Sequence, residues 1–437
     1  MNRTLKSIPQ PPARRPLRAC LARLAPLAML AAAGGAQAQT ASSVTLYGHL
    51  DTGIEHLTNV QGGGSLTRMP GLTGTAPSRW GLRGSEDLGG GLSAVFALES
   101  GFGPDAGTFN QGGRGFGRQA WVGLSGGWGS VSLGRNYTML YWALFDADLL
   151  GPNAFGLSSL DSYIPNTRTD NSLAYRGRFG AWSLGAAYSL GRDAVNAGPS
   201  PAGTNCAGES ATDRQACRQW SAMLKYDTAP WGFALAVDEM RGGAGAFAGL
   251  TRSDLKDRRI MLNGYAALSP TIKLGAGLMR RDNDAAQAAS ASNGATPRST
   301  LAWGGLSWSP SAAVVVDGQL QQLRYARGGD RSTLLALRAT YRFSKRTAVY
   351  AQAARIDNGQ RLAISVSAAT LTSRFSTMAS ITRPTPCSGA LGPAAITRAK
   401  AEAASSALAL PLATRRSRLA RICARPRSSA ASLVSHR

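Results

Sequence analysis

The chain has 437 residues, of which 43% are hydrophobic, and a formal net charge of +24. Length alone would allow two or three soluble domains, but neither long apolar runs nor amphipathic helices dominate, so one large β structure fits better. Residues 1–40 contain six basic and no acidic residues, and residues 371–437 contain eleven basic residues and one acidic residue. Residues 41–370 contain 31 basic and 23 acidic residues. The basic excess is therefore concentrated at the two ends of the chain. The charges between them are spread over predicted strands and loops of a chain that we expect to be exported, which does not favour nucleic-acid binding.

The first 38 residues have the features of a signal peptide. Six basic residues precede an apolar run at residues 24–33, and Ala36-Gln37-Ala38 supplies a small-x-small cleavage site. The run is too short to span a bilayer, and no later segment has the roughly 18–20 continuous apolar residues that a membrane helix needs. We expect export and cleavage after Ala38. The leader alone is also consistent with the alternative of a secreted soluble protein.

Alternating apolar and polar residues predict about fifteen strands between residues 44 and 356. In the first strand, Val44, Leu46 and Leu50 lie opposite Tyr47 and His49. Such alternation suits a strand with lipid on one side and water on the other, and short turns that alternate with long connections are typical of outer-membrane barrels. The predicted strands are residues 44–50, 78–83, 92–102, 116–124, 130–134, 169–176, 182–190, 220–227, 231–238, 259–268, 271–281, 300–309, 313–325, 334–343 and 347–356.

The longest ordered-looking connection, at about residues 136–168, is too apolar for an exposed loop tip. We therefore expect it to pack inside the mouth of the barrel. It contains Tyr137, Tyr141, Trp142, Leu144 and Phe145, followed by Asp146, Asp148 and Asp161.

Cys206 and Cys217 are the only cysteines between the leader and residue 370. We predict that they form a disulfide, since the chain is exported to an oxidising compartment, with a free pair as the alternative. Two cysteines without a nearby histidine cluster make a weak metal site, and we predict neither a metal nor a cofactor.

A motif in the second hairpin points to a known family. Residues 81–92 match the pattern Gly-x-x-Gly-x-Glu-Asp-Leu-Gly-x-Gly-Leu, and Leu133-Gly134-Arg135 leads into the long connection. Both features resemble the general porins of Gram-negative bacteria, especially the beta-proteobacterial type, and the resemblance covers about residues 44–366. It implies a homotrimer of sixteen-stranded barrels in the outer membrane, in contact with lipid, lipopolysaccharide and the assembly machinery, whose third loop narrows the pore.

Charged residues are expected to line that pore. Alternation places Arg79 with Arg83, and Arg338 with Arg342, on water-facing sides of their strands. The resemblance implies that Arg79, Arg118 and Arg135 line the narrowest part of the pore. Arg118 and Arg135 share the parity of outward residues, so their inward placement depends on their being near strand ends. A basic wall opposed by acids on the loop would set up a transverse field and favour anions mildly. The predicted lining residues are Arg79, Arg83, Arg118, Arg135, Asp146, Asp148, Asp161, Arg338 and Arg342.

The pattern ends at Thr370. Porins of this type end in a strand with a terminal aromatic residue, which pairs with the first strand. Residues 371–437 are instead rich in Arg, Ala, Ser and Pro and end in Arg437. We expect the closing strand to be missing and this tail to be disordered or translated out of frame, which would leave two strand edges unpaired in lipid.

We therefore predict an all-β, transmembrane antiparallel barrel, with a signal peptide at residues 1–38, a barrel at 39–370 and an aberrant tail at 371–437. Its function would be passive diffusion of small hydrophilic solutes and ions across the outer membrane, without catalysis. A substrate-specific channel is one alternative. A barrel-borne hydrolase is the other, and it would have to use one of the chain's three histidines, such as His49, without any Gly-x-Ser-x-Gly motif.

Overall fold

The computed structural model describes residues 42–60, 63–151, 154–193, 206–244, 246, 249–284, 298–326, 330–359, 362–367 and 375–386. The predicted signal peptide and most of the predicted tail lie outside the described residues, so both stay predictions.

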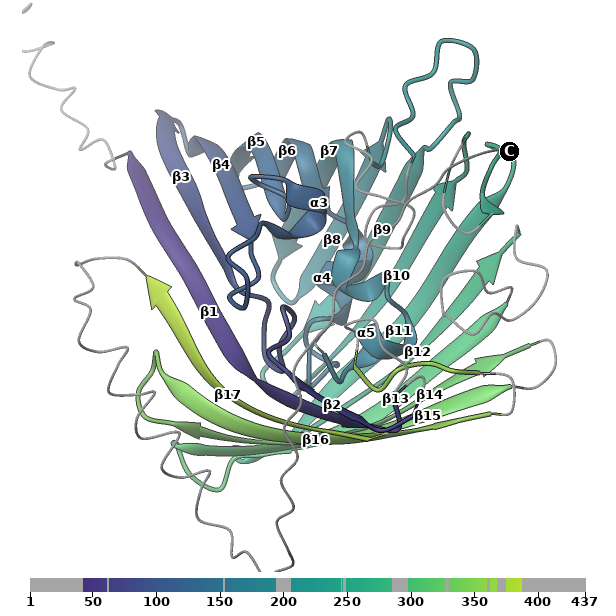
Figure 1. The fold of residues 1–437 in the computed structure, drawn as a ribbon. Coiled ribbons are helices and arrows are strands. Elements are labelled where there is room, and N and C mark those ends of the chain that lie inside the picture. Colours follow the sequence, from purple (N-terminus) through teal and green to yellow (C-terminus); the bar gives the residue numbers. More distant parts are fainter. Residues whose placement is uncertain are drawn as a thin grey trace, which may run out of the picture. The chain divides into compact units, whose positions relative to one another are not determined.

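The described residues form one antiparallel sheet of seventeen strands (Figure 1). All fifteen predicted strands are present, mostly with longer bounds. The order of pairing follows the chain from β3 to β16, β1 pairs with β3, and the four-residue β2 pairs with β1. The strands are β1 (Ser43–Thr58), β2 (Ser65–Arg68), β3 (Arg79–Gly89), β4 (Leu92–Gly101), β5 (Gln119–Gly126), β6 (Gly129–Tyr137), β7 (Arg168–Phe179), β8 (Trp182–Ser189), β9 (Gln219–Asp227), β10 (Trp231–Arg241), β11 (Lys256–Ser269), β12 (Ile272–Asn283), β13 (Ser299–Trp308), β14 (Val314–Tyr325), β15 (Arg331–Arg342), β16 (Ala348–Asn358) and β17 (Phe375–Pro386).

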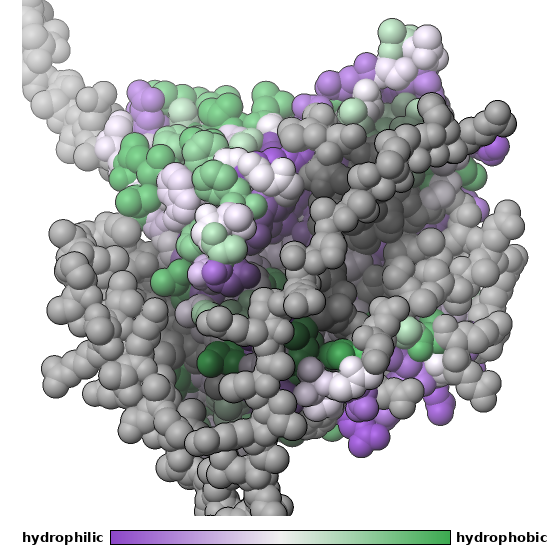
Figure 2. Space-filling model, viewed as in Figure 1, coloured by the Kyte–Doolittle hydropathy of each residue, from purple (hydrophilic) through white to green (hydrophobic). Residues whose placement is uncertain are grey.

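β1 and the strands from β3 to β16 have an outer face with exposed apolar residues and a more buried opposite face. In β1, Val44 and Ile54 are exposed, whereas Asp51 and Glu55 are buried. The same alternation recurs around the sheet, and Figure 2 shows hydrophobic residues gathered on the wall over β3 and β4. A sheet with apolar side chains on its outer face and polar ones inside has the arrangement that lipid on one side and water on the other require.

Short turns join the strands at one end of the sheet, as the sequence predicted. The turn between β3 and β4 contains the acidic, Gly-rich motif, and Asp87 Oδ1 accepts a hydrogen bond of 2.9 Å from the Gly89 N–H. Gly89, Gly90 and Gly91 all have positive φ angles, of 85°, 62° and 79°. A side chain at these positions would be strained, which explains the glycines that the motif has at positions 89 and 91.

β17 corrects one prediction, because it comes from the segment in which we expected no strand. Its backbone pairs antiparallel with β1, from Tyr47↔Pro386 to Thr58↔Phe375, and with β16, from Ala348↔Thr382 to Arg355↔Phe375. Strands pair through backbone N–H and C=O groups, and every residue except proline has both. A segment without alternating apolar and polar side chains can therefore still pair with β1 and β16. Residues 375–386 thus stand where the family's closing strand would stand, and the origin of residues 371–437 stays a prediction.

Four short helices complete the described structure. They are α3 (Asn110–Gly113), α4 (Met139–Leu144), α5 (Leu157–Leu160) and the 3-10 helix η1 (Ile164–Asn166). Among the described residues, no helix is long and apolar enough to cross a membrane.

Candidate functional site

The candidate site is built around the segment between β6 and β7, residues 138–167, which we call the inner loop. It contains α4, α5 and η1, and Figure 1 shows α4 and α5 within the curve of the sheet. Its apolar side chains are buried together, which accounts for a composition too apolar for an exposed tip. The buried apolar residues of the loop include Leu140, Leu144, Leu150, Phe155, Leu157, Leu160 and Ile164.

Backbone groups attach the inner loop to distant strands. The Met139 N–H donates to Ser221 Oγ of β9 at 2.9 Å, and the Leu149 N–H donates to Gln319 Oε1 of β14 at 3.1 Å. Arg338 of β15 donates to the carbonyl oxygens of Leu149 and Leu150 at 3.1 and 2.9 Å. These bonds satisfy loop backbone groups that are removed from water, and they fix the loop against the wall.

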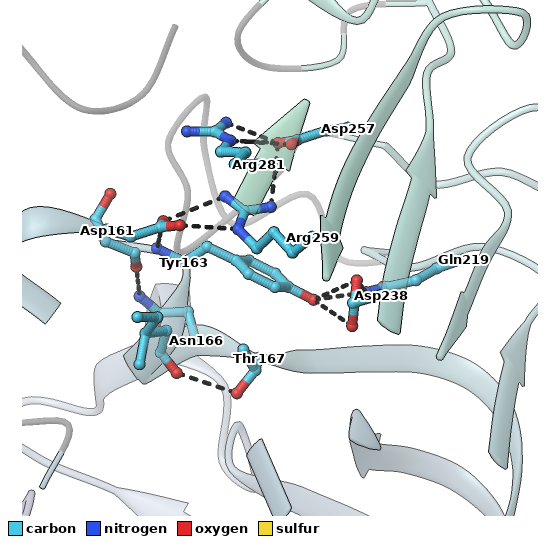
Figure 3. A network of polar contacts seen from close by, with 11 residues as sticks. Asp161, Tyr163, Asn166, Thr167, Gln219, Asp238, Asp257, Arg259 and Arg281 are labelled. Carbon is cyan, nitrogen blue, oxygen red and sulfur yellow. Dashed lines mark hydrogen bonds and ion pairs between the residues drawn. The ribbon is translucent and has the colours of Figure 1, made fainter. Parts of the chain in front are cut away.

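Asp161 holds the far end of the loop through a network of charges (Figure 3). Arg259 of β11 donates to both oxygens of Asp161, at 2.8 and 3.2 Å, and its Nη1 lies 3.2 Å from Asp257 Oδ2. Arg281 donates to the same Asp257 oxygen at 2.7 Å. The Arg259 side chain is only 1% exposed. Asp161 therefore positions the loop, and the structure does not place it with the residues that line the cavity described below.

Tyr163 forms a second attachment beside this network. Its hydroxyl donates to Asp238 at 3.2 Å and accepts from Gln219 Nε2 at 2.6 Å, and the Arg259 guanidinium lies 4.5 Å from its ring centre. Burial raises the pKa of Tyr163 well above its usual value. The hydroxyl therefore stays protonated and can donate to the carboxylate.

A cavity of about 340 Å³ lies between the inner loop and the sheet. Its lining combines five arginines with two aspartates, and the rest is largely apolar. The charged lining residues are Arg79, Arg118, Asp148, Arg168, Asp317, Arg338 and Arg342, and the apolar ones include Tyr141, Leu144, Phe145, Leu149, Leu150 and Val315. Five of the nine lining residues predicted from the sequence therefore come together around one space.

Arg79 and Arg118 share one carboxylate on the wall of the cavity. Arg118 Nε lies 2.6 Å and Arg79 Nε 3.5 Å from Glu99 of β4. Arg118 and Arg168 also both donate to the Tyr137 hydroxyl, at 2.7 and 2.9 Å. Arg118 lies one residue before β5, so the alternation of that strand, which would direct it outward, does not apply, and its side chain lines the cavity.

Arg338 and Arg342 lie on the same face of β15 but differ in their partners. Arg338 Nη2 donates to Asp317 at 2.8 Å, besides its bonds to the loop. Arg342 is exposed, and its guanidinium has no hydrogen-bond or ion-pair partner among the residues that the structure describes. Of these two arginines, Arg342 is therefore the one whose charge is less compensated.

Asp148 is the inner-loop acid that lines the cavity. It is 5% exposed, and its Oδ1 accepts a hydrogen bond of 2.9 Å from Gln319. Burial raises the pKa of Asp148 to about 6, more than the hydrogen bonds and the nearby Arg338 lower it. Its charge therefore changes within the physiological range of pH.

The remaining predicted residues lie elsewhere. Arg83 is exposed, with its guanidinium 5.5 Å from the Tyr47 ring centre, and Asp146 pairs with Lys225. Arg135 lies at a bulge in the β6–β7 ladder, donates to the Gly117 carbonyl at 2.7 Å and pairs with Asp170. The bulge turns Arg135 away from the parity of its strand, but toward Asp170 and not into the cavity.

The structure places Cys206 and Cys217 in a disulfide. The Cys217 N–H donates to the Gly242 carbonyl at 2.8 Å, and both sulfurs lie so close to Gly243 that a Cβ there would be 2.5 Å from the Cys217 sulfur. The disulfide thus lies within the connection between β8 and β9 and packs against Gly243 of the connection after β10.

Sequence reasoning missed Arg168, Asp317, Arg259 and the Tyr163 attachment. Arg168 is the first residue of β7, and Arg259 lies near the start of β11. At such positions the sequence pattern does not distinguish a buried arginine from one exposed at the end of the strand. The parity of Asp317 on β14 would have placed it on the inner face. Among the described residues, no group of three or more His, Cys, Asp or Glu could hold a metal ion, and no serine hydroxyl bonds to His49.

The chain resembles known porins in sequence. Residues 25–361 match the family described as Gram-negative porin. An outer membrane porin protein of Bordetella pertussis is 36% identical over 224 residues, 48% of this chain and 56% of that protein. Outer membrane porin protein 32 of Delftia acidovorans is 36% identical over 231 residues, 50% of this chain and 63% of that protein. The alignments thus span less than two thirds of these two relatives.

Solved structures show the same fold. The anion-selective porin from Comamonas acidovorans has a TM-score of 0.61 at 23% identity, and the match covers 79% of this chain and 100% of that one. A loop L8 deletion mutant of OmpT from Vibrio cholerae has a TM-score of 0.56 at 13% identity, with 79% and 100% covered. The family match covers well over half of the residues, the wall is an antiparallel sheet throughout, and the relatives are outer-membrane proteins. The chain therefore belongs to the Gram-negative porin family of the outer membrane.

Proposed function

We propose that the protein is a channel through which small hydrophilic solutes and ions diffuse across the outer membrane. The observation that carries this proposal is the inner loop, which lies on the polar face of the sheet and leaves a cavity bounded by charged side chains. Such a constriction selects solutes by size and charge and needs no catalytic group. The hydrolase alternative is not taken further, because the family is one of channels.

The charges of the cavity support a mild preference for anions. Five arginines face two aspartates there, and Arg342 has no described partner. Charges in a water-filled pore are screened beyond about 8 Å at physiological ionic strength. The anion preference should therefore be largest at low salt concentration.

The assembly proposed is a homotrimer in contact with outer-membrane lipid and lipopolysaccharide, inserted by the outer-membrane assembly machinery. The exposed apolar side chains of the wall support a lipid-facing surface. Cross-linking of the reconstituted protein tests the trimer, and a monomer as the only species would contradict it.

Single-channel recording tests the channel itself. The full chain, refolded in detergent and added to planar bilayers in potassium chloride, should produce stepwise increases in conductance. Arg342→Gln should still conduct but show a smaller anion preference, whereas Arg252→Gln, on an exposed connection, should behave like the unmodified protein. Correctly folded protein without any conductance would contradict the proposal.

A further inference from the structure

The inner loop carries one apolar side chain whose exposure its packing does not explain. Most apolar residues of the loop are buried, but the phenyl ring of Phe145 is 61% exposed and lines the cavity. Leaving a ring of this size in water forfeits the free energy that its burial would contribute. The ring is therefore available for contact with something that enters the cavity.

The ring ends a column of aromatic side chains. Tyr137 and Tyr141 stack with ring centres 3.9 Å apart, and Phe145 meets Tyr141 edge to face at 5.9 Å and 67°. Exposure increases along the column: Tyr137 is buried, Tyr141 is partly buried and Phe145 is open. The Arg168 guanidinium lies 4.6 Å from the Tyr137 ring centre and closes the buried end. The exposed ring therefore extends an aromatic surface whose other two rings are packed.

Positive charge borders this surface. Arg79, Arg342 and Phe145 line the same cavity, and Arg342 has no partner among the described residues. The cavity lining is largely apolar and carries five arginines against two aspartates, which suits a ligand with one flat apolar part and one anionic part. A guanidinium binds a carboxylate through two parallel hydrogen bonds, and aromatic rings gain free energy by offset or edge-to-face contact.

We propose that this cavity is a weak, saturable binding site for small aromatic carboxylates, with the ring against Phe145 and Tyr141 and the carboxylate toward Arg342. The inference deepens the proposed function, on which it rests, by naming a solute class that would be enriched at the constriction. A simple ion such as chloride or acetate would use only the arginines. An aromatic acid would also use the ring, so it would remain longer and reduce the ion current while bound.

The first test compares carboxylates that carry the same charge. Sodium benzoate, cyclohexanecarboxylate and acetate are added separately to the full chain in planar bilayers, and the potassium chloride current is measured against concentration. We expect saturable block by benzoate at a concentration roughly two- to tenfold lower than for the other two acids, the range that one aromatic contact supplies. Equal block by all three acids would overturn the site.

Variants separate the ring from the charge. Phe145→Leu keeps apolar bulk and should abolish the advantage of benzoate over cyclohexanecarboxylate, while Arg342→Gln should weaken the block by every acid. Phe343→Ala is the matched control, since Phe343 is also an exposed phenyl ring, at 64%, but does not line the cavity. Loss of the benzoate effect in Phe343→Ala, or its retention in Phe145→Leu, would contradict the proposal.

Calorimetric titration of benzoate into the refolded protein in detergent distinguishes this proposal from the channel itself. Binding that depends on Phe145 in a protein without conductance would sustain the site and overturn the channel. Conductance without binding that depends on Phe145 would overturn the site and sustain the channel.

Discussion

The buried ion pair that holds the inner loop offers a quantitative test of the structure. Arg259→Met removes the guanidinium that bonds Asp161 at 2.8 and 3.2 Å, in surroundings where the two side chains are 1% and 6% exposed. A buried carboxylate left without its partner typically costs about 3–5 kcal/mol. Asp257 keeps Arg281 at 2.7 Å, so only one carboxylate loses its counter-ion and we expect the lower end of that range.

Asp161→Asn should cost less than Arg259→Met. It removes the charge but leaves Arg259 its contact with Asp257 at 3.2 Å and with the Tyr163 ring at 4.5 Å. We expect about 1–2 kcal/mol, the cost of weakening a buried, charge-assisted hydrogen bond. The loop should also become more mobile in both variants, since one of its attachments is lost, and single-channel current should become noisier.

The free energy of unfolding can be measured by urea titration of the refolded protein, with tryptophan fluorescence and heat-modifiable migration on gels as two readouts. Arg252→Met is the matched control, because Arg252 pairs with Asp254 on an exposed connection and should not change stability measurably. An Arg259→Met variant as stable as this control, or more stable than Asp161→Asn, would refute the assignment of the pair as the loop's anchor.

The structure leads to four further expected outcomes. The pKa of Asp148 is raised to about 6, so lowering the pH from 7 to 5 should protonate this carboxylate and remove one negative charge from the cavity. The anion preference, measured by zero-current potential, should then increase, and Asp148→Asn should abolish this increase. The same group should destabilise the folded chain as the pH rises through about 6, because folding favours its protonated form. Cys206→Ala should make the connection before β9 more sensitive to proteolysis, measured by cleavage rate, since the disulfide closes a loop of 11 residues in sequence separation. If β17 fills the position between β1 and β16, a chain truncated after residue 387 should refold to a heat-modifiable form and a chain truncated after residue 374 should aggregate.

Most of the fold could be predicted because the wall repeats one simple pattern. Each strand needs apolar residues on alternate positions, so fifteen strands could be located from alternation and turns alone. β2 has only four residues, too few to show a period. β17 was missed because its pairing depends on backbone groups and on the position left between β1 and β16, which no local pattern records.

The site was predicted in part, for reasons that differ between residues. Arg79 and Arg338 lie within regular strands, where parity gives the direction of the side chain. Arg135 lies at a bulge, so its direction depends on a local irregularity that the sequence does not reveal. Asp148 and Asp161 belong to the same loop and have the same chemistry, yet one lines the cavity and the other anchors to Arg259. Only the folded path of the loop separates these two roles.

The zero-current potential of the reconstituted full chain tests the central claim most directly. A planar bilayer containing many channels is placed between solutions of low and moderate potassium chloride, and the voltage at which the current vanishes is measured. We predict a potential whose sign indicates chloride preference and whose size decreases as both salt concentrations are raised, because the arginines become screened. A clear cation preference, or folded protein that inserts without conducting, would contradict it.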